Sequence, residues 1–336
     1  MTVVPRLARP SVALPAACLA IAAALAGCGV NPTPTGAAGS PVASGTAACP
    51  TAPAPPDDLA GWNQAAASDL LPLLINGAGQ LVCGQNRILF TLTQQDGTPV
   101  GAPDRTASIA FYDLGRDPSK PVASAEGAFV WAIKDVRGIY VANVSFPEAG
   151  QYGAEVTTSK GGGSPEALRL RFDVQPSTTV IGVGDKAPAS KTPTLADVGG
   201  DASHISTDTN PDPAFYQTSI DQALAKHDPF VVIFATPKFC TSAQCGPTLD
   251  SIKPYVAKYP GVTFIHVEPY KLKLVDGALQ ADTDANGALQ ATAITDEWHL
   301  VSEPVVYVVN RDGVVTAQFD LIFSDAELTA ALDAVK

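Results

Sequence analysis

Two cysteines, Cys240 and Cys245, have the residue type and spacing that favour redox chemistry in this chain. A nearly continuous apolar run from Phe230 to Thr236 precedes them and is typical of a strand covered on both faces. Apolar residues at helical spacing follow between Leu249 and Tyr259. Unpaired backbone N–H groups and the helix dipole stabilise a thiolate at the beginning of a helix. The pattern therefore predicts a two-cysteine redox site where a strand passes into a helix.

The four residues between the cysteines restrict the local backbone. Residues five apart on a regular helix lie roughly 140° apart around its axis, whereas a disulfide needs Cα atoms about 4.4–6.8 Å apart. The segment from Thr241 to Gln244 must therefore be a turn or loop if the cysteines pair. Cys245 is then expected at the helix N-terminus, which favours it for the lower pKa, with Cys240 in the loop before it. The sequence leaves open which cysteine attacks first.

The region 216–336 alternates between helical and extended patterns, which is typical of a layered α/β domain. The final helix has a capping box formed by Ser324 and Glu327. The expected elements are, in order, helix 220–226, strand 230–236, helix 249–259, strand 262–268, helix 291–298, strands 305–309 and 314–319, and the helix after Ser324.

The segment from Ala235 to Pro247 resembles the redox segment of thioredoxins, which also lies between a buried strand and a helix. It departs from that family in having four residues instead of two between the cysteines. Thr248 stands where thioredoxins have their second cysteine. The resemblance implies a thioredoxin-like α/β C-terminal domain with Cys240 and Cys245 as catalytic residues. It also implies that the first cysteine attacks.

Thioredoxins carry a cis-proline that faces the cysteines, and Ser302-Glu303-Pro304 fits that use. The resemblance implies that Glu303 and Pro304 bind an extended substrate. Over about residues 80–336 the chain is similar to thioredoxin-domain lipoproteins of actinobacteria. The implied activity is thiol–disulfide exchange on exported proteins, with a membrane electron donor or acceptor as redox partner.

Two other families provide alternatives. The Thr-Pro pair before Cys240 and the four-residue spacing resemble peroxiredoxin Q, a peroxidase, although Pro304 occupies the position of that family's peroxide-orienting arginine. Cys240, Cys245 and His266 resemble the ligands of Sco-type copper chaperones, which implies Cu(I) as the metal. No cofactor is expected otherwise.

Two polar residues lie on the expected strand 262–268. His266 and Glu268 alternate with apolar residues, and we expect a hydrogen-bonded structural histidine or a relay of protons to the buried thiol. A further alternative is a binding module in which the Cys240–Cys245 pair is only a structural disulfide.

The N-terminus predicts export. Arg6 and Arg9 precede an apolar run from Val12 to Gly27, which is short for a membrane-spanning helix. The sequence Leu-Ala-Gly-Cys ending at Cys28 resembles the lipobox of bacterial lipoproteins. The resemblance implies a signal peptide over 1–27, lipidation of Cys28, and a lipid-anchored protein on the extracytoplasmic face of the cell membrane.

Charge and cysteine content support this interpretation. The chain has 33 acidic and 21 basic residues and a net charge of −12, with no basic cluster, which argues against nucleic acid as a partner. Four cysteines remain after the signal peptide and the lipidated cysteine are set aside. Because disulfides form outside the cytoplasm, Cys49 and Cys83 are expected to form a structural disulfide.

The remaining regions are a tether, a β-domain and a connector. Residues 28–79 are expected to be a Pro/Ala/Gly-rich tether with a short helix near 70–75. Residues 80–176 have a period of two with Gly and Pro turns, which predicts an all-β sandwich that resembles immunoglobulin-like modules. Residues 177–215 contain four prolines and are expected to be a connector. The expected strands of the sandwich are 88–92, 108–112, 129–133, 139–146, 152–157 and 168–174.

Overall fold

The structure is a computed structural model that describes residues 49–59, 61–62, 68–76 and 81–336. The described residues all belong to one compact unit. The predicted signal peptide 1–27, the lipidation site Cys28 and residues 29–48 of the predicted tether lie outside the described residues. Among the described helices, none has the length and hydropathy needed to cross a membrane.

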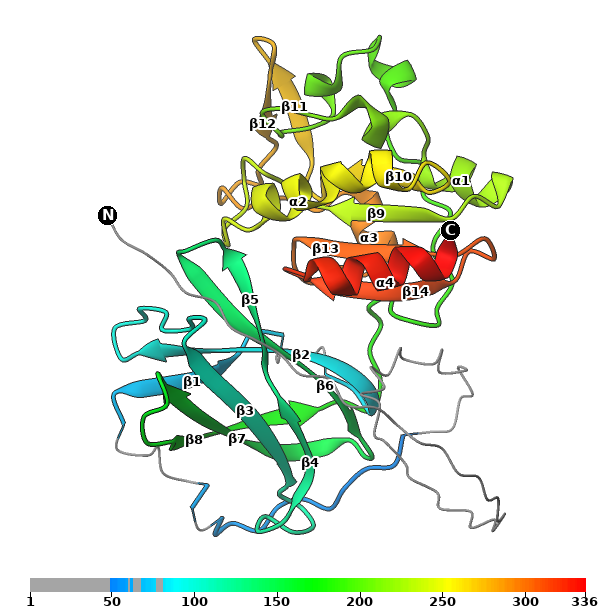
Figure 1. Ribbon diagram of the computed structural model, residues 1–336. Coiled ribbons are helices and arrows are strands. Elements are labelled where there is room, and N and C mark those ends of the chain that lie inside the picture. Colours follow the sequence, from blue (N-terminus) through cyan, green and yellow to red (C-terminus); the bar gives the residue numbers. More distant parts are fainter. Residues whose placement is uncertain (1–48, 60, 63–67, 77–80) are drawn as a thin grey trace, which may run out of the picture. The chain divides into compact units, whose positions relative to one another are not determined.

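The described residues form fourteen strands and four α-helices (Figure 1). The strands are β1 Leu70–Leu74, β2 Gly84–Gln94, β3 Arg105–Asp113, β4 Pro121–Glu126, β5 Ala128–Ile133, β6 Arg137–Phe146, β7 Gly150–Lys160, β8 Glu166–Val174, β9 Phe230–Phe234, β10 Thr263–Val267, β11 Leu272–Val275, β12 Ala278–Ala281, β13 Val305–Val309 and β14 Val315–Asp320. The helices are α1 Ile220–Lys226, α2 Cys245–Lys258, α3 Ala293–Glu297 and α4 Asp325–Val335.

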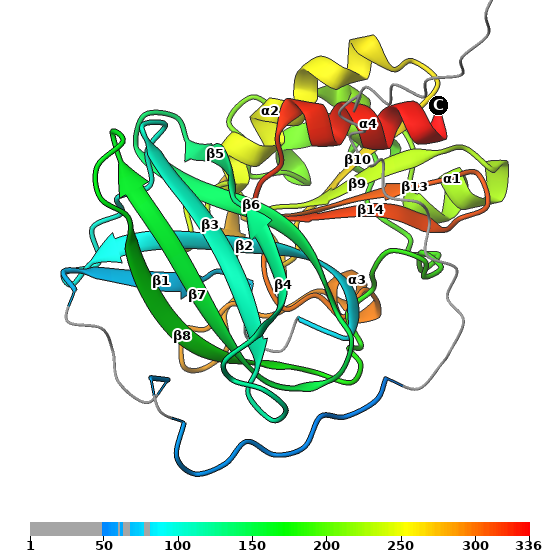
Figure 2. The same ribbon diagram turned by 60° about the horizontal axis from the view of Figure 1, so that its bottom comes forward.

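Strands β1 to β8 form a sandwich of two antiparallel sheets, with strand orders β1-β2-β6-β5 and β4-β3-β7-β8. Figure 2 shows the two sheets packed face to face. Alternate side chains of both sheets point inward, so that Phe90 and Tyr140 stack in the core and Phe111 meets Phe146 edge to face. The predicted immunoglobulin-like sandwich therefore forms, with eight strands instead of the six expected.

The outer face of the first sheet is also buried. Leu89 on β2 and Val141 on β6 pack against Ile322, which lies between β14 and α4. Arg87 on β2 donates hydrogen bonds to the Glu327 carboxylate on α4, with Nε–Oε1 at 2.7 Å. These contacts explain why β2 lacks the polar alternation expected of a sheet with one face in water.

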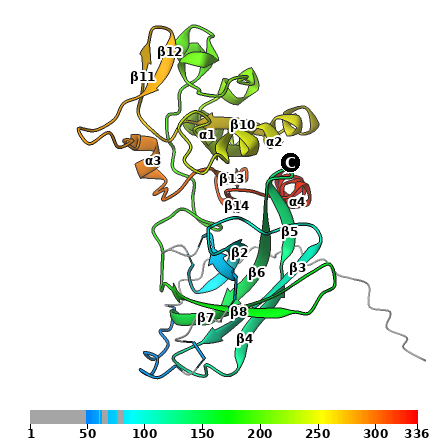
Figure 3. The same ribbon diagram turned by 90° about the vertical axis from the view of Figure 1, so that its left-hand side faces the viewer.

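The C-terminal region contains a mixed sheet in the order β10-β9-β13-β14, in which only the β9–β10 pair is parallel. Helices α2 and α4 pack on the face that carries Ile233 and Val306. Helices α1 and α3 pack on the other face against Phe234 and Tyr307. Figure 1 shows these helices around the sheet, and the hairpin of β11 and β12 extends from this region in Figure 3. The helices and strands predicted here form within a few residues of the expected bounds.

Two segments differ from the sequence-based expectation. Residues 70–74 form edge strand β1 instead of a helix, because the edge of a sheet tolerates Pro72 and β2 offers a pairing partner. The connector 177–215 is packed onto the C-terminal sheet. Its last residue, Phe215, and the adjacent Tyr216 are buried, and three short 3₁₀-helices lie in it or at its end: Leu195–Val198, Ala202–His204 and Pro213–Tyr216.

The predicted fold class, a thioredoxin-like α/β domain beside the immunoglobulin-like sandwich, is wrong. The described part of the chain is mostly β, with 38% of its residues in strands and 17% in helices, arranged in several small sheets. The prediction gave most weight to the helix–strand alternation of 216–336. Helices α1 and α3 in that region are only 7 and 5 residues long, so the strands dominate the chain.

Removing the Cys49–Cys83 disulfide is expected to destabilise the protein. The bond joins residues 34 apart at the entrance to the sandwich, and releasing a loop of that length costs about 2–4 kcal/mol of unfolding free energy. Urea unfolding of the Cys49→Ser/Cys83→Ser variant, compared with the wild type, measures the loss. An unchanged midpoint would show that the disulfide does not constrain the unfolded chain.

Candidate active site

Cys240 and Cys245 form a disulfide in the loop that joins β9 to α2. Their Cα atoms are 6.0 Å apart. The loop turns at Ala243, whose φ of 57° lies in the left-handed region. This turn lets residues five apart meet, and α2 begins at Cys245 as the spacing predicts.

The two sulfur atoms have different surroundings. Cys245 is fully buried against the core, whereas Cys240 is half-buried. The backbone N–H of Cys245 donates a hydrogen bond to the Cys240 Sγ at 3.3 Å, and the Ser242 hydroxyl lies 3.2 Å from the same sulfur. The helix N-terminus therefore faces the sulfur of Cys240, although Cys245 is the residue that begins the helix.

The carboxyl group of Glu303 lies beside the disulfide. One of its oxygens and the two Sγ atoms are all within 4.8 Å of one another. Glu303 precedes Pro304 through a cis peptide bond and is followed by β13. Its Oε2 accepts a hydrogen bond of 2.7 Å from the Tyr270 hydroxyl. Burial raises the pKa of the Glu303 carboxyl, and the Tyr270 hydrogen bond opposes that shift.

The sandwich contacts the same loop through β5 and β6. The Gln244 side chain, which is buried, donates a hydrogen bond of 2.6 Å to the Ala132 carbonyl. Arg137 donates one of 3.3 Å to the Ser242 carbonyl. The loop that holds the cysteines is therefore fixed from both the C-terminal sheet and the sandwich.

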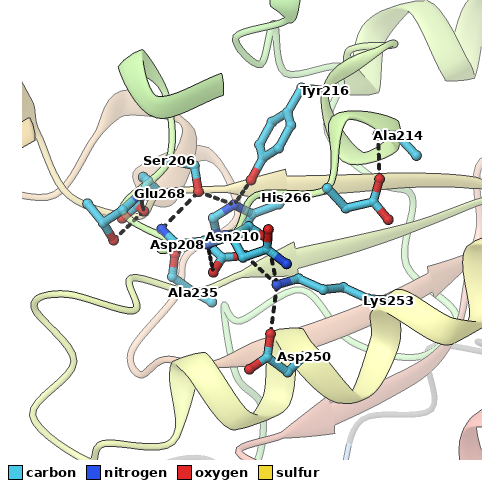
Figure 4. Close-up of polar contacts among 12 residues, drawn as sticks. Ser206, Asp208, Asn210, Ala214, Tyr216, Ala235, Asp250, Lys253, His266 and Glu268 are labelled. Atoms are coloured by element: carbon cyan, nitrogen blue, oxygen red, sulfur yellow. Dashed lines mark hydrogen bonds and ion pairs between the residues drawn. The ribbon is translucent and has the colours of Figure 1, made fainter. Parts of the chain in front are cut away.

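His266 belongs to a separate buried network on β10 (Figure 4). Its Nε2 lies 2.9 Å from the Ala235 carbonyl, which can only accept, so Nε2 carries the proton. Its Nδ1 then accepts a hydrogen bond of 2.8 Å from the Tyr216 hydroxyl. The ring is thus a neutral histidine that fixes the end of β9, directly before the loop of the two cysteines.

Glu268 and Lys253 complete this network. Glu268 Oε1 accepts hydrogen bonds from the backbone and the hydroxyl of Thr207, at 2.6 and 2.7 Å. Lys253 on α2 forms an ion pair of 2.7 Å with Asp208. These bonds attach the 177–215 segment to β10 and α2.

The structure brings together some of the predicted site residues and separates others. Cys240, Cys245 and Glu303 meet, with Pro304 adjacent. His266 and Glu268, the predicted proton relay, make their hydrogen bonds to Ala235, Tyr216 and Thr207 instead. Cys49 and Cys83 form the expected disulfide.

The sequence identifies Glu303 as a site residue, through the resemblance that implies substrate binding, but it does not predict that the carboxyl group lies beside the sulfurs. It does not identify Tyr270. Tyr270 carries no motif, and its only signal is its position shortly after a predicted strand that ends near the site. Both placements depend on which strands are neighbours in the sheet.

Comparisons with known proteins give little further information. No family model matches the sequence, and no curated protein does. A DUF4426 family protein from Pseudomonas aeruginosa is 13% identical, with a TM-score of 0.24 over 34% of this chain and 98% of that one. The Lin-41 filamin domain is 12% identical, with a TM-score of 0.19 over 32% of this chain and 93% of its own.

The predicted membership in the thioredoxin superfamily is wrong. The described part of the chain is mostly β, with its strands arranged in several small sheets. A short cysteine motif and an alternation of helices and strands are local features, and they did not establish the family.

Replacing His266 with glutamine is expected to weaken the pH dependence of stability. Burial lowers the pKa of His266 below its ordinary value of 6.5, so the unfolded chain takes up a proton that the folded chain does not. The wild type therefore keeps this stability above pH 6.5 and loses it as the pH falls below 6.5. Urea unfolding at pH 8 and at pH 5.5 measures the difference.

The half-exposed His204 provides the matched control, because His204→Gln should keep the wild-type loss of stability. His266→Gln should also lower the unfolding free energy at pH 8 by about 1–3 kcal/mol, since buried groups lose hydrogen-bond partners. An identical loss on acidification in the wild type and in His266→Gln would show that His266 is not the titrating group.

Proposed function

We propose that this protein is an extracytoplasmic thiol–disulfide oxidoreductase that acts on exported proteins through Cys240 and Cys245. The observation that carries the proposal is the hydrogen bond from the first N–H of α2 to the Cys240 sulfur. Donors at a helix N-terminus stabilise a thiolate and lower the pKa of its thiol. A sulfur that is both stabilised in this way and half-buried is suited to attack a substrate disulfide.

The different burial of the two sulfurs supports different roles for them. Cys240 is the half-buried cysteine and is the nucleophile, which forms a mixed disulfide with the substrate. Cys245 is buried directly behind it and resolves that mixed disulfide. The order inferred from helix position alone, with Cys245 as the more acidic thiol, is thereby reversed.

The same geometry weighs against the copper alternative, in which Cys240, Cys245 and His266 would bind Cu(I). Cu(I) prefers thiolate and imidazole ligands, and both nitrogens of His266 are engaged by Ala235 and Tyr216. The third ligand atom beside the sulfurs is a carboxylate oxygen of Glu303, which suits harder metals. Thiol exchange therefore has the stronger support.

The proposed location and partners follow from the N-terminal sequence. A lipidated Cys28 would anchor the protein in the bilayer on the extracytoplasmic face, where exported proteins acquire disulfides. A membrane redox partner would then renew the dithiol or the disulfide. The lipid anchor and the membrane redox partner are both parts of the proposal.

Substituting each cysteine separately tests the proposal. The assay follows the reduction of insulin, with dithiothreitol as the electron donor. Cys240→Ser is expected to abolish this activity and the formation of mixed disulfides. Cys245→Ser is expected to abolish turnover but to accumulate a mixed disulfide through Cys240, because the resolving thiol is absent. Mass spectrometry of the trapped adduct identifies the attacking cysteine.

The Cys49→Ser/Cys83→Ser variant is the matched control and should retain exchange activity, since its disulfide lies at the sandwich. If Cys240→Ser and Cys245→Ser both reduce insulin as the wild type does, the proposed function is wrong. Trapping through Cys245 would reverse the assigned roles.

The reduction potential of the Cys240–Cys245 pair provides an independent test. A catalytic pair is expected between about −120 and −270 mV, because a thiolate stabilised by the helix favours the reduced form. Equilibration with glutathione buffers, followed by alkylation and mass spectrometry, measures it. A value below about −300 mV would indicate a structural disulfide.

A further inference from the structure

We propose that Glu303 is the acid–base catalyst of this site, which accepts the proton of the resolving thiol Cys245 and returns it to the departing substrate thiol. This inference rests on the proposed function. It assigns to the Glu303 side chain a catalytic role, whereas the sequence analysis gave the residue only a part in substrate binding.

The geometry places the carboxyl group where the proton must go. A Glu303 carboxylate oxygen lies within 4.8 Å of both sulfur atoms. Cys245 is fully buried, so solvent does not reach its thiol directly. The N–H that stabilises a thiolate on Cys240 is not directed at Cys245, and the second sulfur therefore needs a different means of losing its proton.

The surroundings of Glu303 prepare it for that exchange. The groups that face it are the two sulfurs and the Tyr270 hydroxyl, which donates to Oε2 at 2.7 Å. This hydrogen bond orients the carboxyl group beside the sulfurs. Burial raises the pKa of the carboxyl, which brings it closer to that of a thiol and favours reversible transfer.

The reaction conserves protons and electrons. The Cys240 thiolate attacks a substrate disulfide and forms a mixed disulfide, and one substrate thiolate leaves. Cys245 then transfers its proton to Glu303, and its thiolate attacks the Cys240 sulfur. The Cys240–Cys245 bond forms, the bond to the substrate breaks, and the second substrate thiolate takes the proton from Glu303. The dithiol has lost two electrons to the substrate disulfide.

Single-turnover kinetics separate these steps. The fully reduced protein is mixed with dithiobis-nitrobenzoic acid, an aromatic disulfide, in a buffer that contains a chelator. The first coloured thiol is released when Cys240 attacks, and the second when Cys245 resolves the adduct. Glu303→Gln is expected to slow the second release at pH 7 by at least about tenfold and to leave the first release close to wild type.

The pH dependence distinguishes acid–base catalysis from a packing defect. The difference between Glu303→Gln and the wild type should shrink as the pH is raised well above 7, because hydroxide then removes the proton of the resolving thiol without the carboxylate. Glu126→Gln, an exposed substitution on β4, should match the wild type in both phases. A defect of equal size at every pH would overturn the proposal.

A second variant keeps the test decisive if Glu303→Gln folds poorly. Tyr270→Phe removes the hydrogen bond that lowers the pKa of the Glu303 carboxyl, so the pH profile of the second release should shift to higher pH. If both variants release the second thiol at the wild-type rate, Glu303 is not the catalyst. The proposed function would still stand in that case, since its failure would be seen in the cysteine variants, with Cys240→Ser and Cys245→Ser both reducing insulin as the wild type does.

Discussion

The burial of strand β9 on both faces fixes the geometry on which the candidate active site depends. All five of its residues are fully buried between two helical layers, and it lies between β10 and β13 in the sheet. Its end is held twice more: the Ala235 N–H donates to the Val267 carbonyl, and the Ala235 carbonyl accepts from His266. The loop of the two cysteines therefore starts from a point that cannot move without disturbing the core.

The same constraint determines which sulfur lies at the helix N-terminus. The loop leaves β9, turns at Ala243 and returns to begin α2, so that the Cys240 sulfur comes to lie over the first N–H of the helix. Cys245, as the first helical residue, directs its side chain into the core instead. The Cys240 sulfur accepts a hydrogen bond from the Cys245 N–H, and the Glu303 carboxyl lies beside both sulfurs. The two sulfurs therefore have different electrostatic surroundings. In the proposed reaction, the N–H at the start of α2 stabilises a thiolate on Cys240, and the Glu303 carboxyl takes the proton from Cys245.

The sandwich contributes to the site by restraining its loop. Gln244 and Ser242 are bonded to Ala132 and Arg137, and Thr248, the third residue after Cys245, donates to the Leu321 carbonyl. Leu321 and its neighbour Ile322 in turn pack against the outer face of β2 and β6. The immunoglobulin-like sandwich and the loop of the two cysteines thus share one set of contacts.

The sequence by itself determined the local features of this protein. Apolar periodicity placed most strands of the sandwich and the elements between 220 and 335, and the spacing of the cysteines required a loop followed by a helix. These predictions succeeded because each depends on neighbouring residues. The fold class and the family did not follow from them, since both depend on how all the strands of the chain combine into sheets.

Only the tertiary structure decided which residues meet. Glu303 and Tyr270 lie far from the cysteines in sequence, and the order of strands in the sheet brings them to one place. His266 stands on the strand next to the site, yet its hydrogen bonds point to Ala235 and Tyr216 because the packed connector supplies the partner. Which sulfur faces the helix N-terminus depended on a single turn at Ala243. Spacing along the chain limits which residues can come into contact, and packing in three dimensions determines which of them do.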